Sequence, residues 1–428
     1  MSGKRKPKKI LITNIVTLNP GDAAILQGMI QIFRQKYGED VEIIVFDKLA
    51  DAASKYYPWA SFRQSFFGNE QYGYISRKLK KLGYGHWVRR LRYWRLKFAG
   101  YLYLARIGWF SRLLVNRSDR ESIRIYGDAD LVVSTGGTYL IENYNLSSSI
   151  YDYLLTLSFK KPLIFFTQTL GPFDKEKNIS VFREIFRKSN IIFLRDERSK
   201  KHLLEIGVSE DKIVIAKDSA FAIDANKLEL IQDSERSKPL KIAISVRSLR
   251  FFESGKQGVY ENYKKCIVSM IVLAVEEFDA EICFLSTCQG IPEYWTNDSA
   301  LSEEIYEMLP SDIRKNVFVD GEFRQPLEII RAYKNFDLVI ATRMHAAILS
   351  FVAGTPVLGI AYEFKLEELF DQLSMDKIRL SISNMSGESS AQLLKSIIEN
   401  LDYWKDQVSK IQTSCRKEAN SVIDRLPS

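Results

Sequence analysis

The sequence predicts an α/β protein built from two parallel β-sheets, and three observations lead to this prediction. Short apolar runs rich in Val, Ile and Phe alternate with amphipathic helical patterns along both halves of the chain. A polar stretch, residues 224–240, separates the two halves. The length of 428 residues suits two domains of about 200 residues each. Strands that alternate with helices indicate parallel sheets covered by helices on both faces.

Each half of the chain carries its own series of strands. In the first half, the expected strands are residues 8–14, 41–46, 130–135, 162–168, 191–195 and 212–216, and a helix is expected over 22–37. In the second half, they are residues 241–246, 281–286, 316–320, 337–342 and 356–360. Two doubly wound, Rossmann-like domains that face a cleft resemble the glycosyltransferase-B architecture.

The expected domain organisation follows from these series. Residues 1–223 form the first domain, which carries a basic helical insertion at about 50–127 between its second and third strands. Residues 224–240 are the linker, and residues 241–386 form the second domain. Residues 387–428 form a C-terminal helical segment, which we expect to cross back and brace the first domain.

Composition excludes several functional classes. The hydrophobic fraction of 46% and the charged fraction of 27% are those of a globular protein. Four cysteines lack C-x-x-C spacing and only three histidines are present, so we expect no metal site and no disulfide scaffold. No G-x-G-x-x-G motif occurs, so no dinucleotide cofactor is expected. The absence of a long apolar run and of a signal peptide favours a cytoplasmic chain.

The net charge of +8 is concentrated in one segment, residues 71–118. This segment holds twelve Lys or Arg, eleven aromatic residues and no Asp or Glu. Such a composition favours an anionic membrane surface as partner, on the inner face of the cytoplasmic membrane. A helical subdomain that packs its aromatic residues inward is the first alternative. Nucleic-acid binding is the second and the least favoured, so the prediction is a partner other than nucleic acid.

Ligands of open α/β sheets bind beyond the carboxyl ends of the strands. In the first domain, Asp22 opens the helix that follows the first strand, where it is suited to cap that helix or to act on a ligand. Thr135, Gly136 and Gly137 follow the strand at 130–135, and adjacent glycines allow close approach of a ligand to the backbone. Gln168 follows the next strand and offers an amide to a sugar hydroxyl. Tight structural turns are the alternative for these glycines.

Positively charged side chains gather at the strand ends of the second domain. Arg247 follows the strand at 241–246 and Lys365 follows the strand at 356–360. Between them in the chain, Arg343, Met344 and His345 follow the strand at 337–342 and open a helix, whose free amides add to the positive charge. Since Arg binds carboxylate and phosphate through paired hydrogen bonds, this set suits a small ligand with several negative charges.

These motifs, taken in order, resemble those of the polysaccharide pyruvyl transferase family. The matching residues span about 10 to 370 and are Gly21–Ala24, Gly136-Gly137, Gln168 with Gly171-Pro172, Arg195-Asp196, Asp218–Phe221, Arg247, Arg343–Ala346 and Tyr362–Lys365. The resemblance implies an enzyme of exopolysaccharide or capsule biosynthesis. Such an enzyme moves the carboxyvinyl group of phosphoenolpyruvate onto two sugar hydroxyls, which yields a cyclic pyruvate ketal and phosphate. It implies no cofactor beyond the donor substrate.

The resemblance also suggests a role for each residue set. Phosphoenolpyruvate is expected to contact Arg247, Arg343, Met344, His345 and Lys365. His345 is suited to protonate the methylene carbon or to assist phosphate departure, with Arg343 stabilising the leaving charge. Asp22 is the candidate base for a sugar hydroxyl. A saccharide acceptor, free or lipid-linked, is expected to contact Asp22, Thr135, Gly136, Gly137 and Gln168.

Two other functions remain open on the sequence. The first is a nucleotide-sugar glycosyltransferase of the same architecture, for which Glu363 or Glu367 would have to bind a ribose. The second is a non-catalytic saccharide-binding or assembly protein on the same scaffold.

Overall fold

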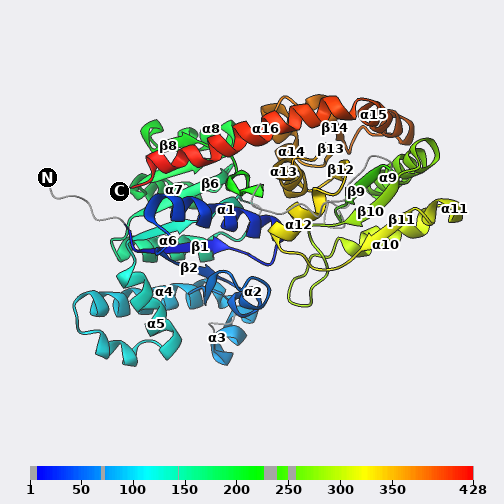
Figure 1. The fold of residues 1–428 in the computed structure, drawn as a ribbon. Helices are drawn as coiled ribbons and strands as arrows, with labels where there is room; N and C mark the ends of the chain where they lie inside the picture. The colour runs from blue at the N-terminus through cyan, green and yellow to red at the C-terminus, as the bar shows by residue number, and fades with distance from the viewer. Residues whose placement is uncertain (1–6, 69–72, 143, 226–238, 249–256, 428) are drawn as a thin grey trace. The chain divides into compact units, whose positions relative to one another are not determined.

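The computed structural model describes residues 7–68, 73–142, 144–225, 239–248 and 257–427 (Figure 1). These residues form two compact units. The first unit comprises residues up to Leu18, Ile25–Ser219 and Glu418 to the C-terminus. The second comprises Asn19–Ala24 and Ala220–Lys417. Most of the expected linker, residues 226–238, lies outside the described residues.

The first unit is built around one parallel sheet. Its strands are β1 (Lys9–Ile15), β2 (Glu42–Asp47), β3 (Ser61–Gln64), β4 (Leu131–Ser134), β5 (Gly137–Leu140), β6 (Leu163–Leu170), β7 (Ile191–Leu194) and β8 (Ile213–Ile215). The order is β3-β2-β1-β4-β6-β7-β8, with β5 paired to β6. All eight residues of β6 are buried, as expected for a strand with helices on both faces.

Helices connect these strands. They are α1 (Pro20–Tyr37), α2 (Ala50–Tyr56), α3 (Tyr74–Leu79), α4 (Gly85–Leu104), α5 (Arg117–Asp128), α6 (Ser147–Ser158), α7 (Glu176–Lys188) and α8 (Glu197–Glu205). The helical insertion is present as α3 to α5 (Figure 1). The expectation that it follows the second strand is wrong, because β3 precedes it. In β3 only Phe62 is buried, so this short strand carries almost no apolar signal in the sequence.

The second unit holds the second parallel sheet. Its strands are β9 (Lys241–Ser245), β10 (Glu281–Leu285), β11 (Val317–Asp320), β12 (Leu338–Ala341), β13 (Val357–Ala361) and β14 (Arg379–Ser381). Their order is β11-β10-β9-β12-β13-β14. Numbered along the chain from β9, this is the order 3-2-1-4-5-6 of a dinucleotide-type doubly wound sheet. β14 is a further strand that the sequence patterns do not predict.

The helices of the second unit cover its sheet. They are α9 (Gln257–Phe278), α10 (Ser299–Met308), α11 (Ser311–Arg314), α12 (Pro326–Tyr333), α13 (Met344–Ala353), α14 (Phe364–Gln372), α15 (Gly387–Glu399) and α16 (Leu401–Ser421). In α13 every residue from Ala346 to Ala353 is buried, and Gly354 ends the helix with a left-handed φ of 84°. Its first turn is thereby fixed at the end of β12.

The C-terminal segment is helical and divides between the two units. Its last residues, from Glu418 onward, are grouped with the first unit. There the carbonyl of Pro427 accepts a hydrogen bond from the Tyr37 hydroxyl at 2.8 Å. In the part of the chain that the structure describes, no helix is both long enough and apolar enough to cross a bilayer.

Candidate functional site

The candidate site lies where the strand order of the second sheet reverses. β9 and β12 are neighbours in the sheet, and their connections leave in opposite directions. Arg247 lies two residues after β9, and Arg343 lies two residues after β12 as the residue that caps α13. Ligands of doubly wound sheets bind at this reversal, beyond the carboxyl ends of the strands. Two guanidinium groups therefore occupy the position that the topology favours for a ligand.

Asp298 links the two strand ends. Its side chain is fully buried, and its Oδ2 accepts a hydrogen bond from Nε of Arg343. Its Oδ1 accepts a hydrogen bond of 3.0 Å from the backbone N–H of Ser248, next to Arg247. Burial disfavours the charge of Arg343, but its hydrogen-bonded ion pair with Asp298 favours it, and the pKa of Arg343 is raised. Arg343 is therefore held both in position and in its charged form.

The surroundings of Arg247 lower its pKa, whereas those of Arg343 raise the pKa of that residue. Burial and the neighbouring charge of Arg343 lower the pKa of Arg247, although Glu363 and Asp298 partly compensate. Its guanidinium carbon lies 4.3 Å from the centre of the Tyr362 ring, a cation–π contact that fixes the plane of the group. A cation that is buried and repelled by another cation gains most when an anion binds between them. This pair thus favours an anionic ligand.

Buried polar groups support the end of β12. The hydroxyl of Tyr263 lies 2.7 Å from Oγ1 of Thr342, and it accepts a hydrogen bond of 3.4 Å from the N–H of Arg247. Cys288 lies beside both arginines, and burial raises the pKa of its thiol to about 12. The thiol is therefore protonated at neutral pH, which makes Cys288 a packing residue and not a nucleophile.

His345 packs against the first turn of α1. A Cβ atom built at Gly21 would lie 2.7 Å from both Cγ and Nδ1 of His345, so only glycine fits beneath the ring. Asp22 follows Gly21, and its negative charge contributes to the raised pKa values of Cys288 and Tyr294, behind the larger effect of burial. The second unit thus brings Asp22 and His345, two predicted catalytic residues, to the arginine pair.

The remaining predicted donor-binding residues lie at helix starts. Met344 is the first residue of α13 and is partly buried. Lys365 lies in the first turn of α14, after β13, with its Nζ 3.1 Å from Oε2 of Glu363. Since β13 neighbours β12, Lys365 belongs to the same edge of the sheet. Donor binding by Met344 and Lys365 stays a prediction.

Apart from Asp22, the residues predicted to bind the acceptor lie near the corresponding reversal of the first sheet, after β4, in β5 and in β6. Thr135 and Gln168 are buried, and Nε2 of Gln168 donates to Oγ of Ser134 at 2.6 Å. A Cβ at Gly136 would lie 2.8 Å from the side chains of Ile25 and Thr167. Gly137 has a φ of 111°, which favours glycine, and it begins β5. These contacts give each residue a structural role, and saccharide binding stays a prediction.

Two buried carboxylates lie near this first reversal, with Lys48 close enough to act on the pKa of both. Asp47 ends β2 and accepts a 2.7 Å hydrogen bond from the N–H of Thr17. Asp152 of α6 accepts a hydrogen bond from the Thr13 hydroxyl in β1. Burial raises the pKa of both, and that of Asp152 reaches about 6. The edge of the first sheet is thus acidic where the edge of the second is basic.

The family-type motif at Arg195 has a structural role in the first unit. Nη1 of Arg195 lies 2.5 Å from Oδ2 of Asp218. Asp196 caps α8, with its Oδ1 accepting a 2.7 Å hydrogen bond from the N–H of Ser199. All three charged side chains are buried. They join β6, β7 and the chain after β8 into one network.

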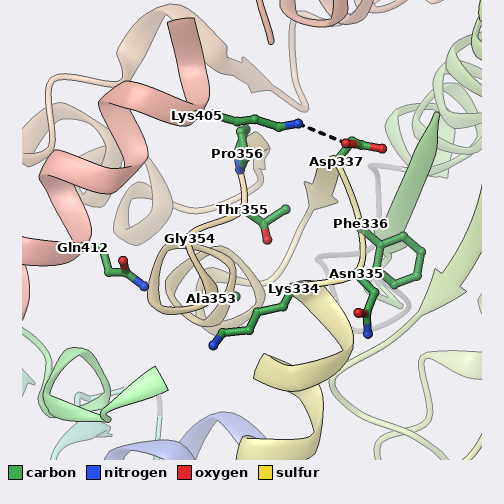
Figure 2. Close-up of a pocket in the computed structure, with 10 residues that line it drawn as sticks. All are labelled: Lys334, Asn335, Phe336, Asp337, Ala353, Gly354, Thr355, Pro356, Lys405 and Gln412. Atoms are coloured by element: carbon green, nitrogen blue, oxygen red, sulfur yellow. Dashed lines mark hydrogen bonds and ion pairs between the residues drawn. The ribbon is translucent and has the colours of Figure 1, made fainter. Parts of the chain in front are cut away.

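A cavity of about 440 Å³ lies at the opposite edge of the second sheet (Figure 2). Asp337 and Pro356, which precede β12 and β13, are among its lining residues. Nζ of Lys405 lies 3.1 Å from Oδ1 of Asp337 across it. The lining lysine Lys334 donates to the carbonyl of Ala225 at 2.5 Å. Because its charges are already engaged, this cavity is not the candidate site.

Asp298 is the principal residue that sequence reasoning missed. It lies 45 positions before Arg343, outside every strand, and its pairing depends on the tertiary fold. The available signal was the Asn297-Asp298-Ser299 run before the α10 pattern, which is typical of a helix start. That signal explains an acidic residue as a cap and says nothing of an arginine partner.

Comparison with known proteins finds similar proteins over most of the chain. A sequence model of the polysaccharide pyruvyl transferase family matches residues 19–363. The chain is also 24% identical over 427 residues to the amylovoran biosynthesis protein AmsJ of Erwinia amylovora. That alignment covers 97% of this chain and 98% of AmsJ. The matched region contains the arginine pair, Asp298 and His345.

Solved structures share the fold at low identity. Anabaena HepE in complex with UDP-glucose has a TM-score of 0.57 at 12% identity, covering 97% of this chain and 98% of HepE. A UDP-N-acetylglucosamine 2-epimerase has a TM-score of 0.58 at 12% identity, covering 98% and 95% of the two chains. Sucrose-phosphate synthase of Thermosynechococcus elongatus has 0.54 at 10% identity, covering 98% and 94%. These are glycosyltransferase-B-type folds, so the predicted fold class is confirmed.

Proposed function

Because this chain belongs to the polysaccharide pyruvyl transferase family, we propose that it transfers the carboxyvinyl group of phosphoenolpyruvate to a sugar during synthesis of an extracellular polysaccharide. The name of its relative AmsJ, an amylovoran biosynthesis protein, supports the polysaccharide context. The product is a cyclic pyruvate ketal on two sugar hydroxyls. The acceptor is the polysaccharide itself or its lipid-linked precursor.

The observation that carries the proposal is the partly buried pair Arg247 and Arg343 at the reversal of the second sheet. Phosphoenolpyruvate offers a carboxylate and a phosphate, and each guanidinium binds such a group through parallel hydrogen bonds. Asp298 engages Arg343 through Nε, which leaves the Nη groups as donors for a ligand. An anion bound there relieves the repulsion between the arginines.

The reaction needs a proton donor, an acceptor base and a place for phosphate. One sugar hydroxyl bonds to C2 of phosphoenolpyruvate while a proton is added to the methylene carbon. The C2–O bond to phosphate then breaks, and the second hydroxyl adds to the resulting oxocarbenium carbon. Both hydroxyl protons leave, so one ketal and one phosphate form. We assign protonation of the methylene carbon to His345, stabilisation of the departing phosphate to the arginines, and removal of a hydroxyl proton to Asp22.

The first test is a calorimetric titration of the full-length protein with phosphoenolpyruvate, beside a panel of nucleotide sugars. We expect phosphoenolpyruvate to bind and Arg343→Ala to abolish binding. Arg331→Ala, which removes an exposed guanidinium of α12 in the same unit, is the matched control and is expected to bind as the wild type does. Because Arg343→Ala leaves Asp298 buried without its partner, Arg247→Met serves as a second variant.

Binding of a nucleotide sugar, with none of phosphoenolpyruvate, would overturn the proposal and favour a glycosyltransferase. Phosphoenolpyruvate binding that survives in both Arg343→Ala and Arg247→Met would refute the assignment of the donor site. Phosphate release that requires a saccharide and disappears in His345→Ala would support the chemistry. Unchanged pyruvylation of the polymer in cells that carry His345→Ala would favour a non-catalytic protein.

A further inference from the structure

Helix α4 carries large apolar side chains that are exposed to solvent. Trp87, Leu91, Trp94, Phe98 and Tyr101 recur at alternating spacings of four and three residues, which places them in one row along the helix. Their exposed fractions range from 46% to 63%. A row of large apolar side chains on the solvent face is unusual for an isolated soluble domain.

The opposite face anchors α4 to the first unit and so fixes the exposure of the row. Tyr93, Leu96, Ala99 and Gly100 are buried. Gly100 lies so close to the Phe159 ring that a Cβ there would be 2.7 Å from it. The guanidinium of Arg92 binds both carboxylate oxygens of Asp119, at 2.5 and 3.1 Å. Since this face is packed and ion-paired, rotating the helix to hide the row would break these contacts.

The row is the centre of a larger surface, the α3–α4 apolar surface. In the described residues, fifteen of the twenty-two exposed large hydrophobic side chains lie between Tyr74 and Leu113. Besides the row they are Tyr74, Ile75, Leu79, Leu82, Tyr84, Leu104, Ile107, Trp109, Phe110 and Leu113. Three tryptophans and three tyrosines are among these exposed side chains, and both residue types favour a membrane–water interface.

Cations accompany this surface and carboxylates do not. Residues 71–118 contain twelve Lys or Arg and no Asp or Glu. The guanidinium of Arg90 lies 5.5 Å from the Trp87 ring, and Nζ of Lys97 lies 4.9 Å from the Trp94 ring. Positive charge beside half-exposed indole rings matches the headgroup layer of an anionic bilayer, where phosphates lie next to the acyl boundary.

We propose that the α3–α4 apolar surface docks on an anionic lipid bilayer, with the row of α4 in the headgroup region. A second copy of the chain fits less well, because pairing two such surfaces would bring like charges together. A single-stranded nucleic acid fits less well, because Ile75, Leu91 and Leu113 offer no stacking face. Docking of this surface on a bilayer does not depend on the proposed transferase activity.

The test is co-sedimentation of the full-length protein with vesicles, read together with tryptophan fluorescence. Vesicles of phosphatidylcholine mixed with phosphatidylglycerol are compared with vesicles of phosphatidylcholine alone. We expect binding to the anionic vesicles, a blue shift of the emission, and at least about tenfold weaker binding at high salt. The triple variant Trp87→Ser/Trp94→Ser/Phe98→Ser should not bind.

Two further variants test the contribution of the cations to vesicle binding and the specificity of the α3–α4 apolar surface. Arg90→Gln/Lys97→Gln keeps the apolar row and is expected to weaken binding to anionic vesicles by about thirtyfold, as loss of two cations near the surface implies. Phe318→Ser/Tyr403→Ser removes exposed aromatic rings of the second unit and is expected to bind as the wild type does. Circular dichroism and thermal unfolding establish that each variant is folded.

Several outcomes would overturn the proposal. They are a folded wild type that ignores anionic vesicles, a triple variant that still binds them, and a control variant that loses binding. Self-association that the triple variant abolishes, without vesicle binding, would assign the surface to a second copy. Tighter binding of single-stranded oligonucleotides than of vesicles would assign it to nucleic acid. None of these outcomes affects the phosphoenolpyruvate titration, so the two proposals fail separately.

Discussion

The two sheets share one strand order but differ in charge where that order reverses. β11-β10-β9-β12-β13-β14 repeats the pattern of β3-β2-β1-β4-β6-β7. At the second reversal the charged groups are Arg247 and Arg343, around a single buried carboxylate. Near the first they are Asp47 and Asp152, which burial pushes toward their neutral forms. The topology fixes where a ligand can bind, and the side chains decide which ligand it is.

This difference bears on which kind of ligand each sheet edge favours. The basic edge favours a ligand with several negative charges, such as the proposed donor. Near the acidic edge, hydroxyl groups and glycines accompany the two carboxylates Asp47 and Asp152. The following predictions test this contrast, beginning with the largest effect.

Arg343→Ala is expected to lower the free energy of unfolding by about 3–5 kcal/mol, because it leaves the fully buried Asp298 without its partner. Urea denaturation measures this loss. The double variant Arg343→Ala/Asp298→Asn should recover part of it, since the orphaned charge is then removed, yet it should still not bind phosphoenolpyruvate. Strictly additive losses in the two single variants would contradict the coupling that we infer.

The buried carboxyl of Asp152 should make the free energy of unfolding of the first unit depend on pH. Burial raises its pKa from 3.8 to about 6, so the folded state binds its proton more tightly than the unfolded state. The carboxyl therefore adds stability that is fully present below about pH 4 and is lost as the pH rises through about 6, a total of about 3 kcal/mol. Urea denaturation from pH 4 to 7 should show this difference between wild type and Asp152→Asn. A difference that does not vary with pH would refute it.

The sequence predicted the basic edge better than the pairing that holds it. Arg247, Arg343 and Lys365 follow long apolar strands, whose ends are readable from composition alone. The partner of Arg343 was not readable, because Asp298 comes from a loop far away in the chain. β3 and β5 were missed for a similar reason: Ser61–Gln64 buries one side chain, and Gly137–Leu140 begins with a glycine that is typical of a turn.

Glycines at the two reversals allow a matched comparison. Gly136→Ala would press against Ile25 and Thr167, and we expect a loss of roughly 1–3 kcal/mol in unfolding free energy with unchanged phosphoenolpyruvate affinity. Gly21→Ala would displace the His345 ring, so it should also lower phosphate release by at least about tenfold. Gly258→Ala, where a Cβ meets nothing within 4 Å, is the control for both. Equal rates of phosphate release in Gly21→Ala and Gly136→Ala would contradict the inference that the two sheet edges differ in their role in the reaction.

Of these substitutions, Arg247→Met is expected to change the stability least. It is also the sharpest test of whether the basic edge binds the donor. Burial and the charge of Arg343 disfavour the Arg247 cation and lower its pKa, whereas its contact with Tyr362 favours it. Because these effects oppose each other, the free energy of unfolding without ligand should change by less than about 1 kcal/mol. Phosphoenolpyruvate should nonetheless cease to protect the protein against thermal unfolding, since a ligand stabilises only the state that binds it. If Arg247→Met destabilises the ligand-free protein as much as Arg343→Ala does, Arg247 is a structural residue and the edge holds one ligand-binding arginine instead of two.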